Sequence, residues 1–336
     1  MGKQKYVIGI DIGGTKIMAV LFDSRFQILA RSRTKTKANE GEKHFHKILR
    51  DEVLQILKEA KVDRDDVVGI GLGCPGIIDE KRGVVRSSPN IRFLKNYPLT
   101  QRITRSTRLP ALAANDVNAG LFGEQQFGAA KRCANVIGVF IGTGIGGAII
   151  ADGRMVSGAF GAAGEFGHIQ ATSVGPLCGC GKRGCLEAVA SRLAIATEAA
   201  GLTARQMAPA LFRKAGTDVK DIRSGTIAKA IRSGDRALEG LVREKGRIIG
   251  STLGALVSAL NPEKIVLGGG LAEALARYLI PEVDQAMRQT AMPALSKSVK
   301  VVAAKLGDYA TAMGAAKMAW DRFYVPPMTR KENRRA

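Results

Sequence analysis

The sequence predicts an α/β protein with two domains, each built around one copy of a β-β-β-α-β unit. Three observations support this prediction. The chain has 336 residues, which suits two domains of ordinary size. A similar order of strand-like and helical segments occurs before and after Cys133, which indicates an internal duplication. Both copies also have a glycine-rich turn between their first two strands.

The first copy begins with three strand-like runs, at 6–12, 16–23 and 26–36. These runs are rich in β-branched and other apolar residues, which favour strands. A helical pattern follows from His44 to Ala60, and a fourth apolar run at 67–73 predicts the next strand.

The second copy repeats this order with strand-like runs at 135–142, 147–153 and 167–171. Several helical patterns come next, and one of them continues from Thr226 to Leu260, just before the stop signal Asn-Pro. The run at 264–270 predicts a strand that ends in three glycines.

These patterns predict a small N-terminal lobe at 1–114, completed by a C-terminal helix at 310–325. The large lobe is expected at 115–309. Residues 326–336 are strongly basic and are expected to form a disordered tail.

Composition indicates an ordinary soluble protein, with 46% hydrophobic and 24% charged residues. The chain enters a strand-like run after five residues, which leaves no space for an export signal. The longest uncharged run, at 133–151, suits two strands around a turn better than a membrane span because it contains repeated glycines. Five cysteines, an odd number, and the missing signal predict a reducing cytoplasm.

The formal net charge of +21 attracts polyanions. Nucleotide, polyphosphate, nucleic acid and an acidic membrane are all candidates. The basic residues are scattered along the chain outside the tail, so the charge is also that of a basic solvated surface.

The glycine-rich turns "DIGGTK" at 11–16 and "GTGIGG" at 142–147 are candidate phosphate loops. Glycine permits a positive φ and lets backbone N–H groups approach phosphate oxygens closely. Two such loops facing each other could clamp one polyphosphate group. Each is also explained as a plain hairpin turn. The three glycines at 268–270 leave room for a flat ligand such as a nucleobase, or form a tight connection.

Three of the five cysteines, Cys178, Cys180 and Cys185, lie within "CGCGKRGCLE", and His168 lies just upstream. Three thiols and one imidazole suit tetrahedral Zn²⁺, and four protein ligands close the site, which makes the ion structural. The alternative is a group of buried or redox-active thiols.

Two carboxylates flank this candidate zinc site, Glu165 upstream and Glu187 downstream. Carboxylates held on a rigid frame are good hydrogen-bond acceptors for a polyol, so the metal could shape a sugar site. Each glutamate alone is also explained as a surface charge or a residue at a helix N-terminus.

Asn115 and Asp116 lie where a strand-like run, 109–115, gives way to a helical pattern. An aspartate there can cap the helix. The same position favours its ionised form, so Asp116 could act as a base in phosphoryl transfer to a hydroxyl group.

Taken together, the sequence resembles the ROK family of bacterial sugar kinases, which have the actin-like ATPase or ribonuclease H-like fold. The resemblance covers nearly the whole chain. It rests on eight motifs in the family's order: "DIGGTK" at 11–16, "GCPGIID" at 73–79, "SPN" at 88–90, "NDVNAG" at 115–120, "GTGIGG" at 142–147, "GEFGH" at 164–168, "CGCGKRGCLE" at 178–187 and "LGGG" at 267–270. It implies a duplicated βββαβα arrangement, with two lobes and a cleft between them.

The resemblance also implies cofactors, ATP with Mg²⁺ and a structural Zn²⁺, and the residues that bind them. The first phosphate loop would contain Asp11, Gly13, Gly14, Thr15 and Lys16, with Asp11 near Mg²⁺. The second would contain Thr143 and Gly144, and the adenosine would lie against Gly268 and Gly269. His168, Cys178, Cys180 and Cys185 would ligate the zinc.

For the sugar, the resemblance implies contacts from Asn90, Asn115, Glu165, His168 and Glu187. His168 would thus serve both the metal and the sugar. Asp116 would be the general base that takes the proton from the hydroxyl that is phosphorylated, usually O6.

These implications favour an ATP-dependent glucokinase. The alternatives are a kinase for N-acetylglucosamine, N-acetylmannosamine, mannose, fructose or allose, a glucokinase that uses polyphosphate, and a sugar-sensing binding protein without catalysis. The family includes repressors with a preceding helix-turn-helix, but here the first strand begins at Tyr6, so we expect no nucleic-acid partner. We expect no membrane partner, and the resemblance implies a homodimer or homotetramer.

Overall fold

The computed structural model describes residues 4–325, which form two compact units. The first unit holds the described residues up to Gly123, the short segment 160–162 and those from Tyr309 onward. The second unit holds 124–159 and 163–308. The lobe boundaries at 114/115 and 309/310 stay a prediction, and the predicted tail at 326–336 lies outside the described residues.

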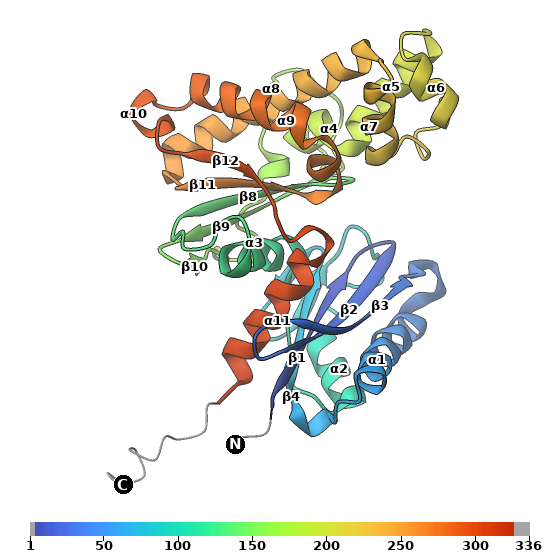
Figure 1. The fold of residues 1–336 in the computed structure, drawn as a ribbon, viewed down its shortest axis with the longest axis vertical. Coiled ribbons are helices and arrows are strands. Elements are labelled where there is room, and N and C mark those ends of the chain that lie inside the picture. The colour runs from blue at the N-terminus through green and yellow to red at the C-terminus, as the bar shows by residue number, and fades with distance from the viewer. Residues whose placement is uncertain (1–3, 326–336) are drawn as a thin grey trace. The chain divides into compact units, whose positions relative to one another are not determined.

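The first unit contains a sheet of five strands (Figure 1). Its strands are β1 (Tyr6–Ile12), β2 (Lys16–Asp23), β3 (Ile28–Lys35), β4 (Val67–Cys74) and β7 (Ala111–Asn115). Their spatial order is β3-β2-β1-β4-β7, in which β1, β4 and β7 run parallel while β2 and β3 run antiparallel to their neighbours. A separate hairpin contains β5 (Ile77–Asp79) and β6 (Val84–Ser87).

Side chains alternate between the two faces of each strand, and most residues of β1, β2 and β4 are buried. Helices therefore cover both faces of this sheet. The face with Ile8 and Ile10 forms a core with α1 (Gly41–Ala60), and α2 (Leu99–Thr107) packs nearby. The opposite face receives α11 (Ala310–Phe323).

Glycines in two strands let α11 lie directly on the sheet. A Cβ at Gly9 would be 1.9 Å from the carbonyl oxygen of Ala312, and one at Gly71 would be 1.9 Å from that of Ala315. Any side chain at these positions would push the helix away. Directly after β7 begins α3 (Asp116–Phe127), whose residues up to Gly123 belong to the first unit and whose later residues belong to the second.

The second unit repeats the strand order of the first, β10-β9-β8-β11-β12. Its strands are β8 (Val136–Ile141), β9 (Ile145–Ala151), β10 (Arg154–Met155), β11 (Lys264–Gly268) and β12 (Lys300–Ala303). The pattern of parallel and antiparallel pairs is also the same. The predicted duplication is therefore present in the topology of the two sheets.

The helices of the second unit include a long pair, α8 (Arg236–Leu260) and α9 (Gly269–Thr290). Gly246, Gly250 and Gly254 follow one stripe of α8, and a Cβ at each would lie within 3 Å of an atom of α9. The stripe lets the two helices pack closely. The other helices are α4 (Leu186–Ala190), α5 (Arg192–Ala204), α6 (Pro209–Ala215), α7 (Ser224–Arg232) and α10 (Pro293–Ser296), with short 3₁₀ turns at Ala38–Glu40, Arg64–Asp66, Phe166–His168 and Gly307–Tyr309.

Two predicted elements differ from the structure. The run at 167–171 is not a third strand: Phe166–His168 form a 3₁₀ turn, and Gln170 makes only an isolated bridge to Cys185. A Cβ at Gly167 would be 2.1 Å from the carbonyl oxygen of Ile145, so this segment packs against β9 by close contact instead of pairing with it. The helical pattern from Thr226 to Leu260 is split into α7 and α8.

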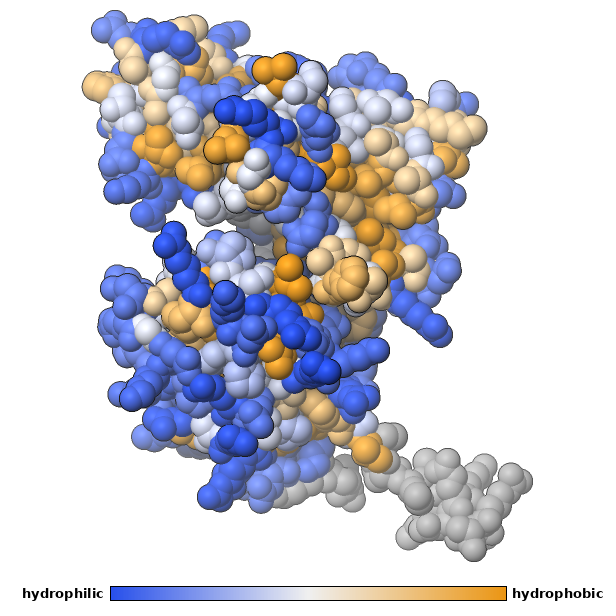
Figure 2. Space-filling view, turned by 180° about the vertical axis from the view of Figure 1, so that it is seen from behind, coloured by the Kyte–Doolittle hydropathy of each residue, from blue (hydrophilic) through white to orange (hydrophobic). Residues whose placement is uncertain are grey.

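The surface is rich in hydrophilic residues over much of the face seen in Figure 2, with apolar residues gathered in separate areas. In the part of the chain that the structure describes, no helix is both long and apolar enough to cross a membrane.

Candidate functional site

Several predicted site residues lie at the carboxyl ends of the parallel strands of the first sheet. Asp11 is in register with Gly73, and Cys74 is in register with Asn115. Burial raises the pKa of the Cys74 thiol far above its usual value, and the charges of Asp116 and Asp11 raise it further. Both carboxylates therefore lie near Cys74 at this edge, where open α/β sheets commonly bind ligands.

Asn115 caps the helix that begins at this edge. Its Oδ1 accepts the backbone N–H groups of Val117 and Asn118 at 2.9 and 3.1 Å, and its Nδ2 donates to the carbonyl of Gly76 at 3.1 Å. The Asp116 Oδ1 accepts the N–H of Val117 at 3.0 Å. The main capping role thus falls on Asn115, while the Asp116 carboxylate lies in the first turn of α3, where the helix dipole stabilises negative charge.

The first candidate phosphate loop is the hairpin turn between β1 and β2. The Gly13 N–H donates to the Lys16 carbonyl at 2.8 Å, and the Thr36 hydroxyl donates to the Gly13 carbonyl at 2.6 Å. A Cβ at Gly14 would be 3.0 Å from the Cβ of Asn90, so the exposed Asn90 lies beside this loop.

The second candidate phosphate loop connects β8 to β9 and is held by two charged side chains. The Glu187 Oε2 accepts the N–H of Ile145 at 2.9 Å. The Arg192 guanidinium donates to the Thr143 hydroxyl oxygen at 3.0 Å. The Gly142 N–H closes the turn by donating to the Gly144 carbonyl at 2.9 Å. Glu187 is thus placed beside a candidate phosphate loop as well as beside the cysteines.

One of the two expected reasons for the glycines in these loops, a positive φ, is wrong. None of Gly13, Gly14, Gly142 and Gly144 has a positive φ. Space is the reason at Gly144, where a Cβ would be 2.1 Å from the Glu187 Oε2. Gly142 has no such neighbour, because nothing lies within 4 Å of its ideal Cβ.

The predicted metal ligands form one cluster. One ring nitrogen of His168 and the sulfur atoms of Cys178, Cys180 and Cys185 all lie within 4.8 Å of one another. The Cys180 and Cys185 sulfurs are 3.6 Å apart, and the Cys178 sulfur is 3.6 Å from the His168 Nδ1. A tetrahedral Zn²⁺ with bonds of about 2.3 Å to sulfur separates its sulfur ligands by about 3.8 Å, so the geometry fits such an ion.

The surroundings of the cluster also suit a metal. The His168 Nε2 lies 3.9 Å from the Glu165 Oε2, so a carboxylate is close to the ring but is not hydrogen-bonded to it. A backbone N–H from Lys182 lowers the pKa of the exposed Cys180, whereas burial raises the pKa of Cys185 to about 11. Binding of a metal to these thiols would release protons.

The cluster connects the two segments that bear the candidate sugar ligands. His168 ends the 3₁₀ turn after Glu165, and Cys185 directly precedes α4, which contains Glu187. The Leu186 N–H donates to the Ile169 carbonyl at 2.9 Å, which joins the same two segments a second time.

The predicted adenosine glycines lie at the carboxyl end of β11, next to the second loop in the sheet. Gly268 is in register with Phe140 of β8. A Cβ at Gly268 would be 2.8 Å from the Phe140 ring, and Gly269 has φ of +84° at the start of α9. Gly269 therefore needs its conformational freedom, while Gly268 needs the absence of a side chain.

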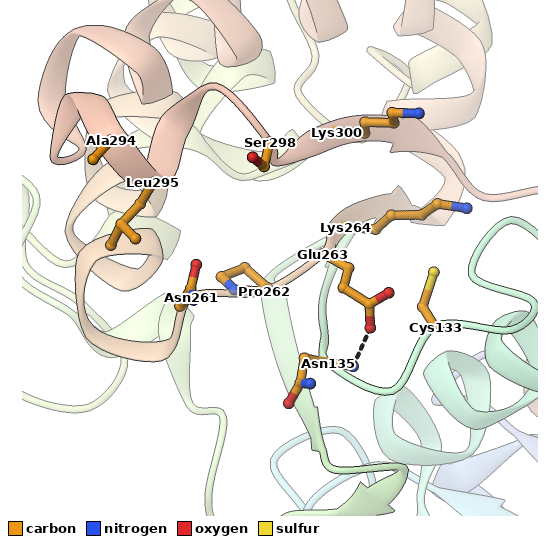
Figure 3. A pocket seen from close by; sticks show the side chains of 10 residues that line it. All are labelled: Cys133, Asn135, Asn261, Pro262, Glu263, Lys264, Ala294, Leu295, Ser298 and Lys300. Atoms are coloured by element: carbon orange, nitrogen blue, oxygen red, sulfur yellow. Dashed lines mark hydrogen bonds between the residues drawn. The ribbon is translucent and has the colours of Figure 1, made fainter.

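A pocket of about 600 Å³ lies at the opposite edge of the second sheet, near the amino ends of β11 and β12 (Figure 3). Its lining includes Lys264 and Lys300, and the Glu263 carboxylate accepts the Asn135 N–H at 2.9 Å. This pocket is distinct from the glycine loops, which follow the carboxyl ends of the strands.

The sequence prediction missed Arg192. An arginine near the start of a helix is usually interpreted as a solvated surface charge. The available signal was its position directly after the N-cap Ser191, because a cation there opposes the helix dipole.

The duplicated five-stranded sheet with glycine loops places the protein in the class of actin-like ATPase folds. The ROK family model matches residues 7–322, and the chain belongs to this family. A solved structure of a ROK family glucokinase from Streptomyces griseus, in complex with glucose and AMPPNP, is 32% identical, with a TM-score of 0.82 over 94% of this chain and 99% of that one.

Curated relatives include both enzymes and regulators. A glucokinase from Streptomyces coelicolor is 34% identical over 93% of this chain and 96% of its own length. A xylose repressor from Caldicellulosiruptor bescii is 28% identical over 93% of this chain and 77% of its own length.

Proposed function

We propose that the protein is an ATP-dependent sugar kinase that phosphorylates a hexose at O6, with D-glucose as the substrate. The observation that carries this proposal is the meeting of Asp11, Asn115 and Asp116 at the carboxyl edge of the first sheet. The similarity to glucokinases over nearly the full length supports glucose as the acceptor.

In this proposal Asp116 is the general base. Its carboxylate accepts the proton of the sugar O6 as that oxygen attacks the γ-phosphorus. The bond between the γ-phosphorus and the oxygen that bridges to the β-phosphate breaks, and ADP leaves. Asn115 fixes the start of α3 through three hydrogen bonds and so holds Asp116 in position.

The glycine loops hold the nucleotide. Gly13, Gly14, Thr15 and Lys16 of the first loop and Thr143 and Gly144 of the second would bind the phosphates, and Gly268 and Gly269 would border the adenosine. A Mg²⁺ ion near Asp11 would neutralise the charge that develops on the transferred phosphate.

The sugar would contact the side chains of Asn90, Asn115, Glu165, His168 and Glu187. A Zn²⁺ ion held by His168 and the three cysteines would fix the positions of Glu165 and Glu187. The His168 Nε2 would stay available to the sugar because the Nδ1 faces the thiols.

A sugar sensor without catalysis is the second candidate, since a xylose repressor is among the relatives. The same sugar contacts would serve both functions, so only turnover separates them. We further propose that the protein works in a reducing cytoplasm as a homodimer or homotetramer, where the thiols of the cluster stay available to a metal.

The test is ADP release from MgATP with glucose, N-acetylglucosamine, N-acetylmannosamine, mannose, fructose and allose, each repeated with polyphosphate as donor. Turnover that depends on glucose supports the proposal, and turnover with another sugar would replace glucose by that sugar. A folded, zinc-loaded protein that binds a sugar without phosphorylating it would support the sensor instead.

A further inference from the structure

The Arg192 guanidinium is directed at the second glycine loop. It donates to the Thr143 hydroxyl oxygen at 3.0 Å, while the backbone N–H of Arg192 donates to the Gly142 carbonyl at 3.0 Å. One residue thus holds both the side chain and the backbone of this loop. Its side chain is half-buried, and Thr143 is exposed.

The direction of this hydrogen bond matters. A hydroxyl group has one hydrogen to donate and two lone pairs that accept. Because the Thr143 oxygen accepts from Arg192, its own hydrogen is left for another acceptor, and the charged donor polarises it. An anionic oxygen above the loop would be the strongest acceptor for that hydrogen.

The position of Arg192 is unfavourable for the helix itself. Arg192 is the first residue of α5, a helix of 13 residues with Ser191 as its N-cap. A cation in the first turn opposes the helix dipole. Among the described residues no carboxylate forms an ion pair with Arg192, so no negative side chain offsets this cost. Such a conflict with a local rule is typical of a functional position.

The other charged side chain at this loop has a different role. The Glu187 carboxylate accepts the N–H of Ile145 and fills the space beside Gly144. It holds the loop from one side and repels an anion, whereas Arg192 holds Thr143 and attracts one. The carboxylate therefore holds the backbone of the loop, and the guanidinium supplies the positive charge that attracts an anion to it.

We propose that Arg192 is a positioning residue for the terminal phosphates of the nucleotide. Its guanidinium orients the Thr143 hydroxyl toward a phosphate oxygen and adds positive charge beside the developing charge of the transferred group. This inference rests on the proposed kinase function, since it assigns a phosphate ligand to the second loop.

The test compares Arg192→Ala, Arg192→Lys and Thr143→Val with the parent enzyme, and Arg205→Ala is the matched control. Arg205 follows the C-terminus of the same helix and is exposed. Steady-state kinetics with the accepted sugar gives kcat and KM for ATP. Calorimetry without sugar gives the Kd of ATP and of adenosine.

We expect Arg192→Ala to weaken ATP binding or lower kcat/KM for ATP by about 10- to 100-fold, the usual effect of a lost charge-assisted contact. Adenosine and sugar affinities should stay within about two-fold of the parent. Arg192→Lys should recover part of the loss, since it keeps the charge but not the planar donors. The effects of Arg192→Ala and Thr143→Val should be less than additive, because each substitution removes the same hydrogen bond between Arg192 and Thr143.

Equal losses for ATP and adenosine would overturn the proposal, because Arg192 would then act only on the structure of the loop. Parent-like ATP affinity and kcat/KM in Arg192→Ala would overturn it as well. If the parent binds ATP but phosphorylates no sugar, the kinase function fails while the ratio of ATP to adenosine affinities still decides the role of Arg192. A parent that does not bind ATP contradicts both.

Discussion

The two sheets share one strand order but differ at their outer edges. The first sheet ends in β3, a strand of eight residues, whereas the corresponding strand of the second sheet, β10, has two. In the second unit the chain instead forms an irregular segment that contains Glu165 and the Cys/His cluster, and this segment leads into α4 with Glu187. The shared framework supplies a glycine loop in both copies, and the departures from it supply the different chemistry.

The first copy has carboxylates at the ends of its strands, and the second has a glycine loop beside the Cys/His cluster. Our proposal assigns the general base to the first copy, and it assigns a candidate zinc site to the second. Each prediction below changes one copy and leaves the other intact.

The largest effect is expected for Asp116→Ala in the first copy. Removing the general base should lower kcat by about 10³-fold, within the usual range for such a group. Sugar affinity should remain measurable, because Asn115 keeps its three hydrogen bonds. Initial rates of ADP release and sugar calorimetry check this. Activity within a few-fold of the parent would remove Asp116 from the mechanism.

Cys180→Ser should act on the second copy alone. The bound zinc should fall below one per chain and the melting temperature should drop by about 5 °C or more, because a structural metal contributes directly to folding. Elemental analysis and calorimetry measure these changes. The control is Cys133→Ser, which lies outside the cluster. If the parent holds no zinc, or if both variants keep it, the metal assignment is wrong.

Gly144→Ala and Gly142→Ala test the second loop with one added methyl group. The Cβ at position 144 would displace the Glu187 carboxylate, so kcat/KM for ATP should fall about ten-fold or more. Position 142 has room for a Cβ, and its variant should stay within about two-fold of the parent. Equal effects in the two variants would show that Glu187 does not hold the loop.

Glu187→Gln should give the smallest effect. The amide oxygen can still accept the Ile145 N–H, but the negative charge beside the sugar is lost. We expect sugar affinity to fall about five-fold and ATP affinity to change by less than about two-fold. Titration of each ligand into the variant measures both, and equal losses would count against the placement of Glu187 at the sugar.

The strands in the centre of each sheet could be predicted from the sequence, because short runs rich in Val and Ile favour buried strands. Residues 167–171 were predicted as a strand and are not one. The Ile169 N–H bonds back to the Phe166 carbonyl within a 3₁₀ turn, while the Ile169 carbonyl and the Ala171 N–H bond to Leu186 and Gly184. The Cys/His cluster could be predicted because three thiols at short spacing are rare. Arg192 could not, because its role depends on contact with Thr143, 49 positions away in the sequence.

The central claim is that Asn90 and Glu165 both bind the sugar. The most direct measurement is calorimetric titration of the accepted sugar into the parent, into Asn90→Ala and into Glu165→Gln. The account predicts that each variant weakens sugar binding by about five-fold or more, with ATP affinity close to that of the parent. Parent-like sugar affinity in either variant would contradict the claim, because that side chain would then make no contact with the sugar.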